Sequence, residues 1–163
     1  MMKIALVTTG GTIDKDYFDA LSDYKVVESI VPMLLERIGS GLTIERKEVC
    51  RKDSLELTEQ DRDELKRTII GLEADKVLVT HGTDTMVDSA LSLGQITDKT
   101  IVFTGAMRPA RFMDTDALFN VGVAIGALQS KESGVFVAMS GQVFSPDSVK
   151  KNRDAQLFES TKS

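Results

Sequence analysis

The sequence predicts an α/β protein with a doubly wound, mostly parallel sheet and helices on both faces, in a Rossmann-like three-layer arrangement. Short apolar runs typical of buried strands alternate along the chain with longer segments whose apolar residues recur at helical spacing. Polar turns that contain glycine follow three of these runs. The length of 163 residues is that of one ordinary domain, so we expect a single domain over residues 1–163.

Five strands are expected from the apolar or alternating runs. They are residues 4–8, 43–49, 77–80, 101–104 and 135–139. A segment long enough for a crossover separates each run from the next. The strands should therefore be parallel and joined by helices.

The segments between the strands carry helix signals. Helices are expected at 27–38, from 58 onward, at 84–93 and at 116–128. In the first, Pro32 lies near the start and Gly39 follows the end, and in the second Thr58 and Asp61 have the spacing of a capping box. The polar stretch 14–25, rich in aspartate and tyrosine, is expected to be a mobile flap outside the core.

The composition disfavours several classes of function. With 20 Lys and Arg against 25 Asp and Glu, the net charge of −5 argues against a nucleic-acid partner. The single cysteine excludes an intramolecular disulfide and a cysteine-type zinc site. No apolar run approaches the ~20 residues of a membrane span, and no signal-peptide pattern opens the chain. We expect a cytoplasmic protein without a membrane partner.

Three similar segments stand at the ends of strand-like runs, namely TTGGTID at 8–14, THGTDT at 80–85 and TGAMRP at 104–109. The carboxyl ends of parallel strands meet at one edge of a sheet, so these segments should line one cleft. Hydroxyls, a carboxylate and small residues would meet there. This combination suits a hydroxyl nucleophile acting on a small polar substrate, and the glycines allow close approach of the backbone.

The chain resembles the bacterial-type L-asparaginases through its TGGTI segment at 9–13 and its HGTDT segment at 81–85. The likeness runs from about residue 4 to residue 158 and includes GAMRP at 105–109 and FNVGVA at 119–124. The chain has half the usual family length, and the second domain of the long enzymes is expected to be missing. The resemblance implies an amidohydrolase that converts L-asparagine and water to L-aspartate and ammonia without a metal or cofactor.

The resemblance also implies catalytic roles. Thr12 would be the nucleophile, although a lone threonine after two glycines usually caps a helix. Thr83 and Asp84 would act with a lysine of a V-x-K pattern, for which Lys151 is the first candidate and Lys150 the alternative. A lysine beside a carboxylate can pass protons when it is partly desolvated, whereas an exposed one is a plain surface charge.

Substrate recognition is implied in the same way. Ser54 resembles the serine that contacts the substrate carboxylate, and Asp84 would hold the α-ammonium. Leu55 stands where some long enzymes carry glutamine. Tyr17 or Tyr24 of the flap would orient the Thr12 hydroxyl. The implied substrate-binding set is Gly11, Ser54, Gly82, Thr83, Asp84 and Ala106.

Other interpretations remain open at this stage. His81, the only histidine, is expected to be buried, neutral and hydrogen-bonded rather than a general base. The alternative function is a sensor that binds a small amino acid without turnover. A weaker alternative is a subunit acting with a partner on aminoacylated tRNA. Because the chain would have to close its pocket with its own flap or another copy, a homodimer or higher homo-oligomer is expected.

Overall fold

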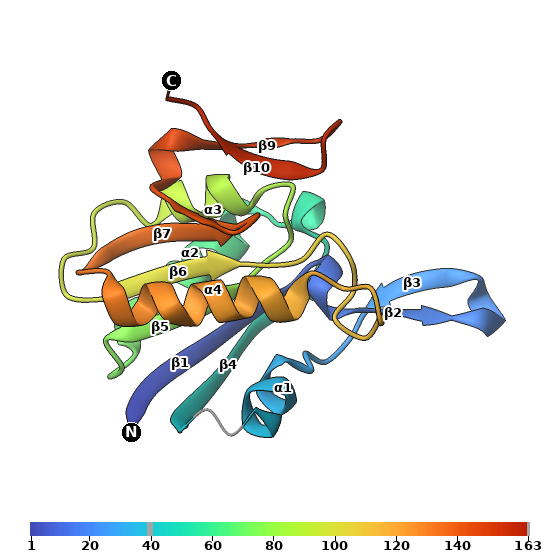
Figure 1. The fold of residues 1–163 in the computed structure, drawn as a ribbon, viewed down its shortest axis with the longest axis horizontal. Helices are drawn as coiled ribbons and strands as arrows, with labels where there is room; N and C mark the ends of the chain where they lie inside the picture. Colours follow the sequence, from blue (N-terminus) through green and yellow to red (C-terminus); the bar gives the residue numbers. More distant parts are fainter. Residues whose placement is uncertain (39–40, 163) are drawn as a thin grey trace.

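The computed structural model describes residues 1–38 and 41–162 and has a six-stranded sheet at its centre (Figure 1). The strand order is β4-β1-β5-β6-β7-β8, in which the first five strands are parallel and β8 is antiparallel to β7. The strands are β1 (Met2–Gly10), β4 (Leu42–Lys52), β5 (Lys76–Thr80), β6 (Thr100–Thr104), β7 (Gly134–Met139) and β8 (Gln142–Phe144). The doubly wound prediction is confirmed, and each expected strand lies within an observed one.

Helices cover both faces of the sheet (Figure 1). They are α1 (Val31–Arg37), α2 (Glu59–Gly71), α3 (Met86–Ser92) and α4 (Ala117–Ser130). In β1, Ile4 and Leu6 pack with α1 and α4, whereas Ala5 and Val7 pack with α2 and α3. Because both faces of the strand are buried, the sequence of β1 contains a continuous apolar run.

The helix boundaries follow local signals in the sequence. The hydroxyl of Thr58 accepts a hydrogen bond from the Asp61 backbone N–H at 3.2 Å, and the Asp61 carboxylate accepts one from the Thr58 N–H at 2.8 Å. The predicted capping box at α2 is therefore confirmed. Helix α1 begins at Val31, later than expected, with Pro32 in its first turn. The expected stop at Gly39 lies outside the described residues.

Two hairpins and one strand were not predicted. They are the hairpin of β2 (Lys15–Phe18) and β3 (Asp23–Val26), the strand β8, and the hairpin of β9 (Val149–Asn152) and β10 (Leu157–Ser160). The first hairpin forms most of the expected flap and projects from the body (Figure 1). The expectation that the flap begins at Asp14 is wrong, because Asp14 is only 1% exposed. Its backbone C=O accepts a hydrogen bond from Val27 at 2.9 Å, which closes the base of the hairpin.

The predicted ligand edge of the sheet lies at the point where the strand order changes direction, between β1 and β5. Thr8 pairs with Thr80, and Thr80 pairs with Thr104, so β1, β5 and β6 end level with one another. The segments that follow these strands therefore lie side by side, as the sequence predicted.

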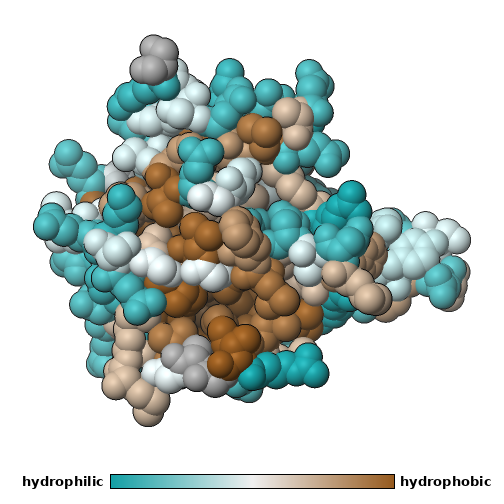
Figure 2. Space-filling model, viewed as in Figure 1, coloured by the Kyte–Doolittle hydropathy of each residue, from teal (hydrophilic) through white to brown (hydrophobic). Residues whose placement is uncertain are grey.

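A groove of about 470 Å³ lies on another face, between α1 and α4. Apolar residues gather over these two helices on the visible face of the molecule (Figure 2). The groove is lined mainly by Leu34, Leu35, Ile38, Leu42, Leu118, Val121 and Ile125. Within residues 1–38 and 41–162, no helix has the length and apolar character needed to cross a membrane.

Candidate active site

The first two signature turns, which are the TGGTI segment at 9–13 and the HGTDT segment at 81–85, are in direct backbone contact. A Cβ atom added to Gly11 would lie 2.4 Å from the Cα and N atoms of Gly82, and one added to Gly82 would lie 2.5 Å from the Ser54 Cβ. Gly11 also has a φ of +84°, which favours glycine. Larger residues would separate the turns. Thr12 and Thr83, which follow these glycines in sequence, are thus held near each other.

Hydrogen bonds between the strand ends support this contact. The Thr9 hydroxyl donates to the Thr80 carbonyl at 3.0 Å, and the Gly11 N–H donates to the Lys52 carbonyl at 2.9 Å. The His81 backbone N–H donates to the Thr104 carbonyl at 3.0 Å. Each bond joins neighbouring strands at the edge where the cleft is expected.

Thr12 begins a short 3-10 helix (Thr12–Asp14) and is half-buried. The N-cap position belongs to Gly11, and no side chain caps this helix, so the interpretation of Thr12 as a cap is not supported. No hydrogen bond among the described residues engages the Thr12 hydroxyl. The side chain is therefore free of the competing bond that would hold a purely structural threonine.

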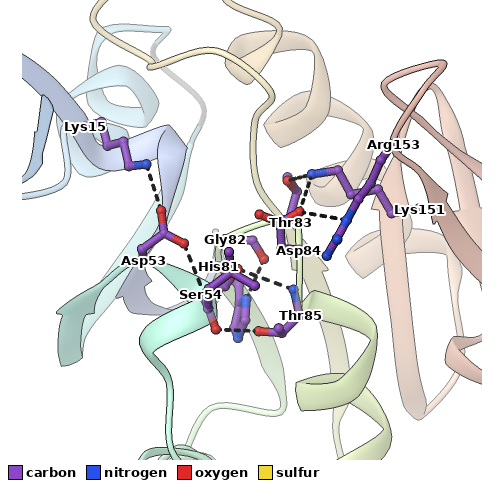
Figure 3. A network of polar contacts seen from close by, with 11 residues as sticks. Lys15, Asp53, Ser54, His81, Gly82, Thr83, Asp84, Thr85, Lys151 and Arg153 are labelled. Carbon is purple, nitrogen blue, oxygen red and sulfur yellow. Dashed lines mark hydrogen bonds and ion pairs between the residues drawn. The ribbon is translucent and has the colours of Figure 1, made fainter.

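Thr83, Asp84 and Lys151 form a compact polar cluster (Figure 3). The Lys151 ammonium donates to the Thr83 hydroxyl oxygen at 2.7 Å and to Oδ1 of Asp84 at 2.9 Å. Lys150, the alternative base, instead lies 3.4 Å from Glu159 with a side chain that is 60% exposed. Of the two lysines, the structure brings only Lys151 to the threonine and the aspartate.

Ser54 lies beside the cluster and is fixed by Thr85 (Figure 3). Its hydroxyl accepts a hydrogen bond from the Thr85 N–H at 3.3 Å, while the Thr85 hydroxyl donates to the Ser54 carbonyl at 2.8 Å. The preceding Asp53 accepts a 2.7 Å bond from Lys15. Burial opposes ionisation of Asp53, but the Lys15 ammonium and the Leu55 N–H outweigh it and lower the pKa of the carboxyl. Asp53 is thus paired as an anion at the foot of the β2–β3 hairpin.

His81 is a structural residue, as predicted. It is fully buried, Nδ1 lies 2.7 Å from the Gly82 carbonyl and Nε2 lies 2.7 Å from the Ser89 hydroxyl. Because a carbonyl only accepts, Nδ1 carries the proton and Nε2 accepts from Ser89. Burial lowers the pKa of His81 to about 4. The ring is therefore neutral near pH 7 and holds the turn in shape.

Tyr17 and Tyr24 are a directly opposed pair across the β2–β3 hairpin. Their ring centroids lie 5.0 Å apart, and Tyr24 also lies 6.0 Å from Phe112. Both side chains are exposed, and among the described residues neither hydroxyl bonds Thr12. Ala106 is 1% exposed, so of the expected binding residues it offers a ligand little side-chain surface.

Sequence reasoning missed two charged residues near the site, Lys15 and Arg153. Arg153 lies 3.4 Å from Asp84 Oδ1, the same oxygen that Lys151 contacts. The sequence offered no local signal for this contact, because Arg153 lies in the turn that follows β9 rather than on the strand. Within the described part of the chain, no group of three or more His, Cys, Asp or Glu side chains could hold a metal ion.

Fold and site together define an α/β domain with two threonines, a carboxylate and a lysine at the switch point of the sheet. Residues 3–162 match the protein family described as Asparaginase, N-terminal, and the chain belongs to that family.

Relatives of this family differ in name and length. The glutaminase-asparaginase of Acinetobacter glutaminasificans is 29% identical over 166 residues, which cover 91% of this chain and 49% of that protein. A subunit of the glutamyl-tRNA(Gln) amidotransferase of Haloquadratum walsbyi is 34% identical over 144 residues, covering 83% of this chain and 32% of that protein. The crystal structure of a probable cytoplasmic L-asparaginase from Campylobacter jejuni has a TM-score of 0.80 at 28% identity, covering 98% of this chain and 52% of that chain. The chain thus spans about half the length of the two asparaginase relatives and a smaller share of the amidotransferase subunit.

Proposed function

We propose that this protein is an amidohydrolase that converts L-asparagine and water to L-aspartate and ammonia. The observation that carries the proposal is the contact of the Lys151 ammonium with both Thr83 and Asp84, at 2.7 and 2.9 Å. A lysine shared by a hydroxyl and a carboxylate is suited to moving a proton. Membership of the asparaginase family and the named relatives support the substrate.

Thr12 is the proposed nucleophile. Its hydroxyl oxygen attacks the side-chain amide carbon, the C–N bond breaks, and the nitrogen leaves as ammonia after taking up a proton. Water then attacks the resulting ester, which releases L-aspartate and restores the Thr12 hydroxyl. The freedom of this hydroxyl from structural hydrogen bonds among the described residues supports this role.

Thr83, Asp84 and Lys151 are proposed to act as one proton-handling unit. The Lys151 ammonium first releases a proton to solvent, and the resulting amine accepts the Thr12 proton through Thr83 during attack. Lys151 then returns this proton to the departing nitrogen, and Asp84 stabilises the ammonium while it is present. In the ground state Asp84 binds the α-ammonium of the substrate and Ser54 binds its α-carboxylate. One of Tyr17 and Tyr24 closes over the substrate and orients Thr12.

The test is an ammonia-release assay with L-asparagine, D-asparagine and L-glutamine. L-Asparagine should be hydrolysed fastest, with one L-aspartate formed for each ammonia. Binding of L-aspartate without ammonia release from any of the three amides would instead favour the amino-acid sensor. Release only in the presence of an aminoacylated tRNA and a partner protein would favour the amidotransferase-type subunit, since a protein of that name is among the relatives.

We further propose that the protein works in the cytoplasm as a homodimer or higher homo-oligomer, without nucleic-acid or membrane partners. The similarity to the probable cytoplasmic L-asparaginase from Campylobacter jejuni supports the location. The exposed apolar groove between α1 and α4 supports self-association. Light scattering of the purified protein should give at least twice the 17.8 kDa chain mass. A single species of the chain mass at micromolar concentration would contradict it.

A further inference from the structure

Asp84 is contacted by two cations at a single oxygen atom. Oδ1 lies 2.9 Å from the Lys151 ammonium and 3.4 Å from Nε of Arg153 (Figure 3). Lys151 and Arg153 together outnumber the one carboxylate, so this corner of the site carries a net positive charge. Binding of a substrate ammonium requires only the carboxylate, so the presence of Arg153 as a second cation needs a separate explanation.

The two cations differ in how firmly they are held. Lys151 is 16% exposed and also bonds Thr83, whereas the side chain of Arg153 is 66% exposed. An exposed ion pair contributes little stability, because water and salt screen the two charges. Arg153 can therefore be displaced from Asp84 by another cation, while Lys151 remains in place.

The backbone keeps Arg153 close to the site. Arg153 follows β9 directly, and its carbonyl accepts a 3.3 Å hydrogen bond from the Gln156 N–H, which closes the turn toward β10. Lys151 and Arg153 therefore reach toward the same carboxylate. Lys150 is the neighbouring residue of β9 and so lies on the opposite face of the strand, where it pairs with Glu159.

We propose that Arg153 is a specificity-determining residue that competes with the α-ammonium of a ligand for Asp84. This inference rests on the proposed function only in taking Asp84 as the ammonium subsite. A ligand with an α-ammonium must displace the guanidinium, which remains nearby and repels it. A dicarboxylate or its half-amide that lacks the ammonium does not have to displace Arg153. The negative charge of such a ligand is instead attracted by the guanidinium. Arg153 thus shifts selectivity from amino acids toward small dicarboxylic acids and their amides.

Calorimetric binding of L-aspartate and of succinate measures this effect, since the two ligands differ only by the α-ammonium. The readout is the ratio of the succinate Kd to the L-aspartate Kd. Arg153→Gln should raise this ratio about fivefold, or about 1 kcal/mol, and Arg153→Lys should raise it less. In the parent protein the ratio should also increase with salt, because an exposed charge is screened.

Lys150→Gln is the matched control, because it removes a cation of similar exposure from the same hairpin that does not face Asp84. It should leave the ratio unchanged. An unchanged ratio in Arg153→Gln, or an equal rise in Lys150→Gln, would overturn the proposal. So would failure of both ligands to bind the parent and the Arg153→Gln variant, because Asp84 would then not be an ammonium subsite.

The outcome is separable from that of the amidohydrolase proposal. If the ratio shifts as expected but L-asparagine gives no ammonia, the role of Arg153 stands and the proposed reaction is wrong. If ammonia is released but the ratio does not shift, the reaction stands and the role of Arg153 is wrong. Circular dichroism of each variant confirms that the comparison is made between folded proteins.

Discussion

Thr83 and Asp84 follow β5 of the central sheet and contact Lys151 of β9, whereas Tyr17 and Tyr24 belong to β2 and β3. The β2–β3 hairpin projects from the body of the molecule (Figure 1). Thr83 is 6% exposed and is joined to Lys151 by a hydrogen bond, while Tyr17 and Tyr24 are 41% and 48% exposed. The first region is positioned by close backbone contact between strand ends. The second is positioned mainly by its own cross-strand pairing. The proposed proton-handling groups, which must be preorganised, thus occupy the packed region, and the tyrosines proposed to close over the substrate occupy the other.

The largest effect is expected in the packed region. Lys151→Met should reduce the rate of ammonia release about 10²–10⁴-fold, the usual contribution of a proton-transferring side chain. Thr83→Ala should have a similar effect. The double variant should be little slower than either single variant, because groups that share one step are not additive. Lys150→Met is the control. Losses that multiply in the double variant would show that the two residues act independently.

A pH-dependent stability effect is expected at Asp14, which lies between the two regions. Burial, opposed in part by Ser29 and Arg111, raises the pKa of Asp14 from 3.8 to about 7. The folded protein keeps this proton up to about pH 7, whereas the unfolded chain releases it near pH 4. Rising pH therefore favours unfolding across this interval, by up to roughly 1.4 kcal/mol for each pH unit.

Asp14→Asn removes this titration. Between pH 4 and pH 8, the ionisation of Asp14 should lower the free energy of unfolding of the parent protein. In Asp14→Asn the decrease over the same interval should be smaller by on the order of 2–4 kcal/mol. Urea denaturation at a series of pH values measures the difference, with Asp19→Asn as an exposed control from the hairpin. Parallel pH curves for the parent and Asp14→Asn would show that Asp14 ionises normally in the folded protein.

The contact between the two signature turns can be tested with a single methyl group. In Gly82→Ala the new Cβ would overlap Ser54, which should lower the free energy of unfolding by about 1–3 kcal/mol and reduce ammonia release. Gly122→Ala on α4 is the matched control, since nothing lies within 4 Å of its added Cβ. It should be neutral or stabilise the helix by up to about 1 kcal/mol. Equal stability of the two variants would argue against the close contact.

The smallest effect is expected on the hairpin. The tyrosine that orients Thr12 should lose about tenfold in kcat on replacement by Phe, about 1.4 kcal/mol in the barrier. The other tyrosine should lose little, because it serves as the ring on which its partner packs. Parallel assays of Tyr17→Phe and Tyr24→Phe measure this. Full kcat in both variants would mean that neither hydroxyl takes part.

Mobility of the hairpin is a separate expectation. Hydrogen exchange of residues 15–26 should slow when L-aspartate binds, together with the three turns at the strand ends. The same stretch without ligand serves as the reference. Unchanged exchange at saturating ligand would mean that another surface closes the pocket.

The packed region could be predicted from the sequence because its signals are local. Apolar runs identified the parallel strands, and the ends of these strands placed Thr12 and Thr83 at one edge of the sheet, whereas Ser54 came from the resemblance alone. Lys151 was preferred to Lys150 by its resemblance to the V-x-K pattern of the family, and the alternation of β9, which was not predicted, explains why only one of the two faces Asp84.

The remaining features depend on distant contacts. Asp14 stands at the start of a polar stretch, which is typical of an exposed residue, yet packing against residues around Ser29 and Arg111 buries it. The β2–β3 hairpin lacks the alternating apolar pattern of a half-buried sheet, because it projects into solvent. Arg153 approaches Asp84 only because the β9–β10 hairpin folds back over the site. A single sequence contains no local signal for such approaches.

The most direct test of the central claim compares ammonia release from L-asparagine by the parent protein and by Thr12→Ala. The account predicts steady release of ammonia and L-aspartate in equal amounts by the parent, and a loss of at least about 100-fold in Thr12→Ala, which is about 2.7 kcal/mol in the barrier. L-Aspartate should still bind the variant, and Thr12→Ser should retain more activity because it keeps the hydroxyl. Activity of Thr12→Ala within tenfold of the parent would contradict the assignment of Thr12 as the nucleophile.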